Sequence, residues 1–157
     1  MERIIKKSNK FHLSNSTTDL LATAISWLCM GLFLYTAYAK IVDHTRFLRG
    51  LESVSLIGGA ALLISFAVPA IEVVVAFLLL IPRTLRIGLY TFIGVMTTFT
   101  IYIGIAMIWE KKLPCHCGGA IEKLSWAQHL WFNVGFIAVA MFALLLVNQK
   151  RLLKIKK

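Results

Sequence analysis

Acidic residues are scarce in this sequence, in which seven Asp and Glu stand against seventeen Lys and Arg. The formal charge of +10 does not indicate a nucleic-acid partner, because the basic residues gather at the termini and in short loops. They form no basic face interleaved with aromatic side chains, which nucleic-acid binding requires. Cysteine is also rare. The chain has three cysteines, enough for one pair with one left over.

Apolar residues, by contrast, make up 59% of the chain, too many for a soluble domain of this size. They gather in runs of about 20 residues, each long enough to cross a hydrocarbon core roughly 30 Å thick. We predict an all-α membrane protein, a single polytopic domain over residues 1–157 with four transmembrane helices in an up-down-up-down bundle. The predicted spans are residues 20–40, 57–81, 85–109 and 126–147, with basic tails at 1–19 and 148–157.

Local patterns add detail to these spans. Phe47, Leu48 and Leu51 fall on one side of the charged segment after the first span, which predicts a short amphipathic helix at the interface. Ser125 and Gln128 have the spacing of a capping box at the start of the fourth span. Small residues in the third span predict close contacts with other helices. These are Gly88, Gly94 and Gly104.

The distribution of Lys and Arg predicts the orientation through the positive-inside rule. Eleven of these residues fall in the two tails and the second loop, and six fall in the first and third loops, where Lys40 is counted. We therefore expect both termini in the cytoplasm and the third loop on the outer face of the membrane. In a bacterium with two membranes, this loop is periplasmic.

The third loop holds the residues that point to chemistry, namely Cys115, His116, Cys117, Gly118 and Gly119. Two cysteines one residue apart close a smaller ring than Cys-X-X-Cys, so we expect a strained disulfide that is easily reduced. His116 favours the thiolate, which is the attacking species. The two glycines remove side-chain bulk where the backbone of a partner approaches. The loop therefore predicts reversible thiol–disulfide exchange.

Three other interpretations of this loop remain open. A purely structural disulfide is one, although so tight a loop gains little chain entropy. A zinc or copper site is another, with Cys115, Cys117 and either His116 or His129 as ligands, although adjacent residues cannot easily all point inward. Thiols without a role are the third.

Two residues inside the spans also call for an explanation. Cys29 lies in the middle of the first span, where a free cysteine packs as a small apolar residue. Glu72 is the one acidic residue deep in an apolar span, and such a carboxylate is costly without a partner or a function. A rise of about 1.5 Å per residue puts Glu72 roughly 20 Å from the cysteine loop. We expect it to hydrogen-bond to a neighbouring helix or to handle protons, and not to assist the thiols directly.

Several motifs follow one another between residues 20 and 147. They are Tyr38-Ala39-Lys40, Asp43, Phe47-Leu48 with Leu51, Pro69-Ala70-Ile71-Glu72, Leu78-Leu79-Leu80, Arg83-Thr84 and Pro114-Cys115-His116-Cys117-Gly118-Gly119. In this order they resemble the MauE/DoxX-type redox-associated membrane proteins of bacterial inner membranes. The resemblance implies a thioredoxin-like partner, a part in making or maintaining disulfides of exported proteins, and a dithiol relay at Cys115 and Cys117.

Quinone-linked disulfide-forming oxidases and vitamin K epoxide reductases resemble this chain in architecture only. They carry two cysteine pairs, whereas this chain has one pair and a distant Cys29. No second dithiol is available to pass electrons onward, so we do not expect self-contained quinone coupling, and a bound quinone is left open.

We predict a membrane-embedded thiol–disulfide relay or accessory protein of the bacterial inner membrane, an oxidoreductase if the exchange is catalytic. Its expected cofactor is the redox-active disulfide itself. Its expected partner is a thioredoxin-like or disulfide-containing exported protein. Two alternatives remain. One is a non-catalytic subunit of a larger membrane complex with a structural Cys-X-Cys loop, and the other is a metal-handling membrane protein.

Overall fold

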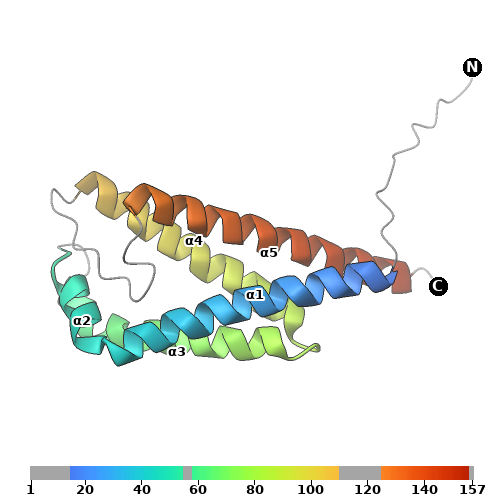
Figure 1. Ribbon diagram of the computed structural model, residues 1–157, viewed down its shortest axis with the longest axis horizontal. Coiled ribbons are helices and arrows are strands. Elements are labelled where there is room, and N and C mark those ends of the chain that lie inside the picture. The colour runs from blue at the N-terminus through green and yellow to red at the C-terminus, as the bar shows by residue number, and fades with distance from the viewer. Residues whose placement is uncertain (1–14, 55–57, 110–124, 156–157) are drawn as a thin grey trace, which may run out of the picture.

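The computed structural model describes residues 15–54, 58–109 and 125–155, and this part of the chain is helical without a strand (Figure 1). Four helices are long and apolar enough to cross a membrane. They are α1 (Asn15–Val42), α3 (Ala61–Leu80), α4 (Leu85–Trp109) and α5 (Trp126–Ile155). This confirms the predicted fold class, an all-α membrane protein with four spans. Two short elements, α2 (His44–Glu52) and the 3-10 turn η1 (Gly58–Ala60), lie between α1 and α3.

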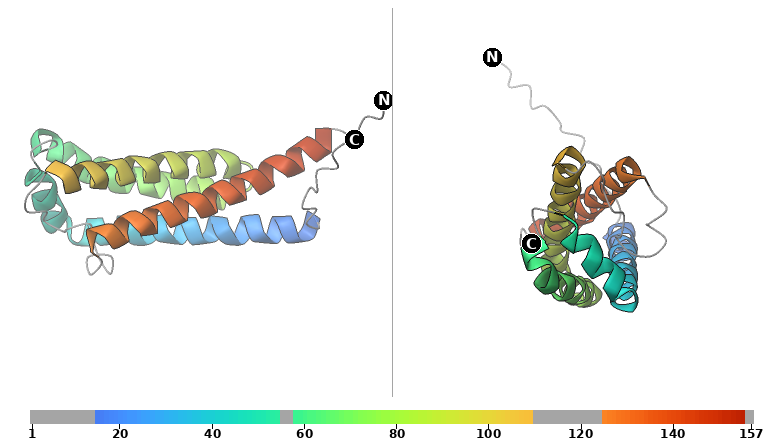
Figure 2. Two further views of the ribbon diagram at one scale, coloured as in Figure 1. Left: turned by 90° about the horizontal axis from the view of Figure 1, so that it is seen from above. Right: turned by 90° about the vertical axis from the view of Figure 1, so that its left-hand side faces the viewer.

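The four long helices pack as an antiparallel bundle. Helix α1 packs against α3 and α5, and α4 packs against the same two helices. The start of α1, the end of α5 and the turn between α3 and α4 lie toward one end of the bundle, and α2 lies across the other end (Figures 1 and 2). We refer to the latter as the α2 end.

The tightly packed core lies away from the α2 end of the bundle. Phe33 of α1 and Phe92 of α4 stack there with ring centroids 4.4 Å apart. Small side chains of α5, Ala140 and Ala143, are fully buried beside them and let the helices approach closely. Cys29 belongs to the same cluster with no exposed surface, which confirms that it packs as a small apolar residue.

Helix α2 has the predicted amphipathic character. Its buried residues are Phe47 and Leu51, one turn apart, and they pack against Ala61 at the start of α3. His44 Nε2 lies 3.1 Å from Ser65 Oγ, a second link from α2 to α3. These contacts hold α2 across the end of the bundle, with Phe47 directed inward.

The ends of the last two helices agree with the predicted spans except at the end of α5. Helix α4 spans the predicted residues 85–109, whereas α5 runs on to Ile155, eight residues past the predicted span. The capping box at the start of α5 is present. The backbone N–H of Ser125 donates to Gln128 Oε1 at 2.8 Å, and the N–H of Gln128 donates to Ser125 Oγ at 3.4 Å.

Replacing Ser125 by alanine should therefore destabilise the protein by about 1 kcal/mol, because one amide at the start of α5 loses its acceptor. Ser125→Asp is the control, since aspartate is an equally good N-cap. Unfolding of both variants in mixed micelles, followed by circular dichroism, measures the difference. Equal losses in the two variants would contradict the role of the cap.

The prediction of close helix contacts is right for one glycine of α4. A side chain at Gly88 would lie 2.9 Å from the backbone of Leu78 and Leu79 in α3, so only glycine fits there. The prediction is wrong for Gly94 and Gly104, where an added Cβ would meet nothing within 4 Å. Gly88 lies near the tight turn between α3 and α4, where the two backbones converge, and the other two positions lie farther along α4.

Candidate functional site

Glu72 lies in the middle of α3 on the face that the helix turns toward the bundle. The buried residues of α3 recur every three or four positions, which places them on one helical stripe. They are Ala61, Ser65, Pro69, Glu72, Val75, Ala76 and Leu79. Glu72 is only 1% exposed, whereas its neighbours Ile71 and Val74 are exposed on the outer face. The periodicity of α3 thus carries a carboxylate into the interior of the bundle.

Two polar residues of α1 face this carboxylate. Thr36 and Lys40 are four residues apart, so they lie on the same side of α1, one turn from each other. Both are buried. A long helical side chain runs back toward the N-terminus of its helix. Lys40 accordingly extends back over Thr36 and donates a hydrogen bond to the Thr36 carbonyl oxygen at 3.4 Å.

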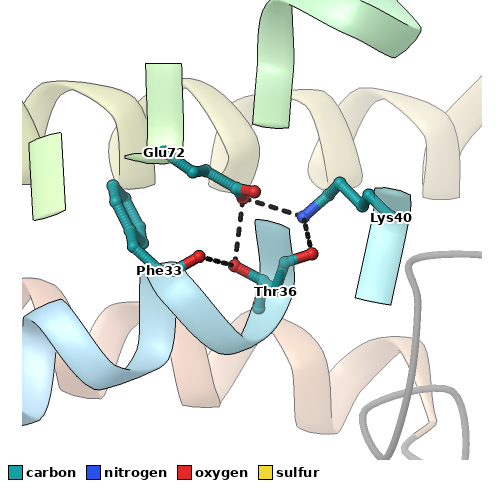
Figure 3. Close-up of polar contacts among 4 residues, drawn as sticks. All are labelled: Phe33, Thr36, Lys40 and Glu72. Atoms are coloured by element: carbon teal, nitrogen blue, oxygen red, sulfur yellow. Dashed lines mark hydrogen bonds and ion pairs between the residues drawn. The ribbon is translucent and has the colours of Figure 1, made fainter. Parts of the chain in front are cut away.

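Lys40 and Glu72 form a hydrogen-bonded ion pair between α1 and α3 (Figure 3). Lys40 Nζ lies 2.8 Å from Glu72 Oε1. Thr36 Oγ1 lies 3.1 Å from the same oxygen and 3.2 Å from the carbonyl oxygen of Phe33, so its single proton is shared between two acceptors. One oxygen of the carboxylate therefore receives both donors from α1.

Two aromatic rings flank the ammonium group. The ring centroids of Phe47, from α2, and Phe99, from α4, lie 5.8 Å and 5.9 Å from Lys40 Nζ. Each ring presents a face of partial negative charge, which attracts a cation at this range. The charge of Lys40 is thus stabilised by one carboxylate, one carbonyl and two rings, contributed by four different helices.

The ion pair leaves hydrogen-bonding capacity unused. Glu72 Oε2 is buried and has no hydrogen-bond partner among the described residues. An ammonium has three protons to donate, and within residues 15–54, 58–109 and 125–155 Lys40 uses two, on Thr36 and Glu72. A buried carboxylate oxygen without a donor costs free energy. The site can therefore accept one hydrogen bond and donate another to a group placed beside it.

A cavity of about 370 Å³ opens beside the pair, and its wall is overwhelmingly apolar. It is lined by residues of all five helices, Leu32, Phe33, Thr36, Lys40, Phe47, Leu51, Ile64, Val68, Glu72, Met96, Thr98, Phe99, Tyr102, Ile103, His129, Phe132 and Asn133. The bundle is therefore closely packed around the Phe33–Phe92 core, and the cavity lies nearer to the α2 end. This volume lies within the range of small-molecule sites, roughly 300–1,000 Å³.

The cavity has a second polar wall on α5. His129 and Asn133 are four residues apart and therefore share one face of the helix. They are 4% and 8% exposed, and both line the cavity. From the sequence, His129 was an alternative metal ligand, and the structure places its side chain in the interior of the bundle. Polar side chains of α1, α3 and α5 thus line the cavity among mostly apolar residues.

The residues that were predicted to carry the chemistry lie outside the described residues. They are Cys115, His116, Cys117, Gly118 and Gly119. The same holds for three of the four alternative metal ligands, of which only His129 is described. What the structure gives is the position of the two helix ends that bound this segment. Helix α4 ends at Trp109 and α5 begins at Trp126, both toward the α2 end (Figure 1).

One comparison with known proteins identifies the family. A family model described as methylamine utilisation protein MauE matches residues 18–146, which cover α3, α4, the cysteine loop and most of α1 and α5. This chain belongs to the MauE family. Searches of the curated proteins and of the solved structures found no match. With the four apolar helices, the MauE match makes this a multi-pass membrane protein.

Two functional features of this MauE-family chain were not predicted from its sequence. Lys40 was counted as a loop cation, and the structure corrects this, because the residue lies within α1 and is buried against Glu72. The spacing of Thr36 and Lys40 on one helical face was the available signal, since a buried carboxylate needs such a partner. The cavity left no signal in the sequence, because it depends on how five helices meet.

Proposed function

We propose that this MauE-family protein is a membrane accessory protein of methylamine utilisation that exchanges disulfides with an exported partner through Cys115 and Cys117. In the exchange, a thiolate attacks a disulfide sulfur, a mixed disulfide forms, and one thiolate leaves. The second cysteine then attacks the mixed disulfide and releases the partner. Two electrons and two protons pass between the two dithiol pairs, so the chemistry balances without a further reagent.

The observation that carries this proposal is the burial of the third cysteine. Cys29 has no exposed surface and is packed in the core between α1, α3, α4 and α5. The chain has three cysteines, so Cys115 and Cys117 are the thiols that remain for a partner. They stand one residue apart inside the matched range 18–146, on the segment between α4 and α5.

We further propose that the protein lies in the bacterial inner membrane with both termini in the cytoplasm and the cysteine loop in the periplasm. Lys40 is neutralised by Glu72 inside the bundle and no longer counts as a loop charge. Without it, five Lys and Arg remain on the side of the cysteine loop, against eleven on the side of the termini. The larger number favours the cytoplasm. An oxidising periplasm is also the compartment in which a disulfide persists.

The proposal predicts that Cys115 and Cys117 change redox state in living cells. We expect alkylation with mass tags to show a mixed population of reduced and oxidised pairs that shifts after a mild reductant. The Cys29→Ser variant should give the same pattern, because Cys29 is inaccessible in the folded protein. Of the single variants Cys115→Ser and Cys117→Ser, the one that keeps the cysteine bonding to the partner and lacks the resolving cysteine should accumulate mixed disulfides with the exported partner. The double serine variant should leave that partner unoxidised.

Three results would contradict the relay. Normal oxidation of the partner in the double serine variant would show that the pair is dispensable. A pair that stays oxidised under every condition would indicate a structural loop in a subunit of a larger complex. Thiols that become taggable only after a chelator is added would indicate metal handling.

A further inference from the structure

We propose that the cavity beside the Lys40–Glu72 pair is a binding site for a lipid-soluble quinone and its quinol. The inference rests on the proposed function only for the role of this ligand. When two thiols form a disulfide they release two electrons and two protons, and a quinone that takes up both becomes the quinol. Binding itself is argued from the described residues alone.

The hydrogen bonds that the ion pair can still accept and donate indicate which polar group the ligand carries. Glu72 Oε2, in a residue that is 1% exposed, has no donor among the described residues, and Lys40 keeps one proton for an acceptor. A hydroxyl group can donate to Oε2 and accept from Nζ at the same time. A carbonyl oxygen can accept from Nζ. The quinol therefore satisfies both groups and the quinone satisfies one.

The aromatic rings around the Lys40 ammonium favour a flat ligand. Phe47 and Phe99 lie 5.8 and 5.9 Å from Lys40 Nζ, so a ligand that reaches Nζ passes close to both. Phe132 and Tyr102 add two more rings to the wall. Flat unsaturated rings pack well against aromatic side chains, in offset or edge-to-face contacts.

The second polar wall matches the far side of such a ligand. A quinone ring carries oxygen atoms at opposite positions. The cavity likewise has polar side chains on separate helices, Lys40 on α1 and Glu72 on α3, and His129 and Asn133 on α5. An isoprenoid tail suits the apolar remainder of the wall, which lies in the membrane-spanning parts of α1, α3, α4 and α5 and on α2.

Simpler occupants fit less well. A single water molecule, with a share of liquid volume of about 30 Å³, would satisfy Glu72 Oε2 but leave most of the roughly 370 Å³ cavity unfilled. An acyl chain would fill the cavity but leave the carboxylate oxygen without a donor. A ring with hydroxyl or carbonyl groups does both.

The test is retention of a quinone by the purified full-length protein in lipid nanodiscs. Decylubiquinone and decylubiquinol are the probes, and 1-decanol is the control for a hydroxyl on a chain without a ring. After washing, the retained probe is extracted and measured by chromatography. We expect about one quinone per protein, and decanol at the level of empty nanodiscs.

Two variants of α3 locate the bound probe. Val68 lines the cavity, so Val68→Phe should fill it and reduce retention to background without touching the ion pair. Val74 is 58% exposed on the outer face of the same helix, and Val74→Phe should bind as the wild type does. Equal retention by these two variants, or retention of decanol at the level of the quinone, would overturn the proposal.

A third variant tests the hydrogen bond to the carboxylate. Glu72→Gln replaces a carboxylate that only accepts hydrogen bonds by an amide that also donates them. We expect retention of the quinol to fall by about tenfold or more relative to the quinone, since a hydrogen bond to a charged group is lost. An unchanged ratio of retained quinol to retained quinone in this variant would show that the ligand does not hydrogen-bond to Glu72.

The double variant Cys115→Ser/Cys117→Ser separates this site from the relay. It should bind decylubiquinone as the wild type does, because the side chains proposed to hold the ring are those of Lys40, Glu72, His129 and Asn133. Binding without disulfide exchange in the wild type would refute the relay and leave the site standing. Disulfide exchange without binding would refute the site and leave the relay standing.

Discussion

Replacement of Lys40 by methionine is expected to lower the free energy of unfolding by about 3–5 kcal/mol. Methionine fills a similar volume but leaves the carboxylate of Glu72 buried, with the hydroxyl of Thr36 as its one remaining donor among the described residues. Breaking one partner of a buried ion pair costs this much because the other charge stays behind without compensation. Reversible unfolding of the purified protein in mixed micelles, monitored by circular dichroism, measures the loss.

Two further variants make this test specific. The double variant Lys40→Met/Glu72→Met should recover most of the lost stability, because an apolar pair of similar volume replaces the ion pair. Arg46→Met is the matched control. Arg46 lies 3.2 Å from Asp43, but both side chains are about half exposed, so the loss should stay within about 1 kcal/mol. Additive losses in the double variant would contradict coupling of the two charges.

The second large effect is expected at Gly88. Gly88→Ala should destabilise the protein by about 1–3 kcal/mol, which is typical of overpacking. The added Cβ would lie 2.9 Å from backbone atoms of Leu78 and Leu79. A flexible side chain could move aside, but here α3 and α4 must separate near the turn that joins them. The same unfolding measurement detects the change.

Gly94 provides the matched control on the same helix. A Cβ at Gly94 meets nothing within 4 Å, so Gly94→Ala should leave stability unchanged or raise it by roughly 0.5–1 kcal/mol through helix propensity. Equal effects of alanine at both positions would show that the contact between α3 and α4 is not the cause.

Much of the fold could be predicted because each span carries its own signal. The long apolar runs gave the four helices, and Ser125 with Gln128 gave the start of the last one. The end of α5 was missed for a physical reason. Hydropathy falls where the chain leaves the lipid, near residue 147, whereas a helix ends where its backbone hydrogen bonds end. The residues up to Ile155 continue the helix beyond the apolar run.

The candidate site could be predicted only in part. A carboxylate within an apolar run is visible in the sequence, so Glu72 could be identified as a candidate from the sequence alone. Its partner did not, because Lys40 is 32 residues away and looks like one more loop cation in a count of charges. The cavity is harder still. It depends on α2 lying across the bundle and on Phe47, Phe99 and His129 converging from three helices.

The position of the ion pair along the chain has a consequence for biogenesis. Lys40 and Glu72 belong to α1 and α3, two consecutive spans that leave the ribosome before α4 and α5. Glu72 lies in the middle of α3, and a charged residue near the centre of an isolated span raises its insertion free energy by about 2.5–3.5 kcal/mol. When α3 reaches the translocon, the ammonium of Lys40 is already in place in α1. The two spans can therefore enter the bilayer as a hairpin with neutralised charges, before α4 and α5 are synthesised.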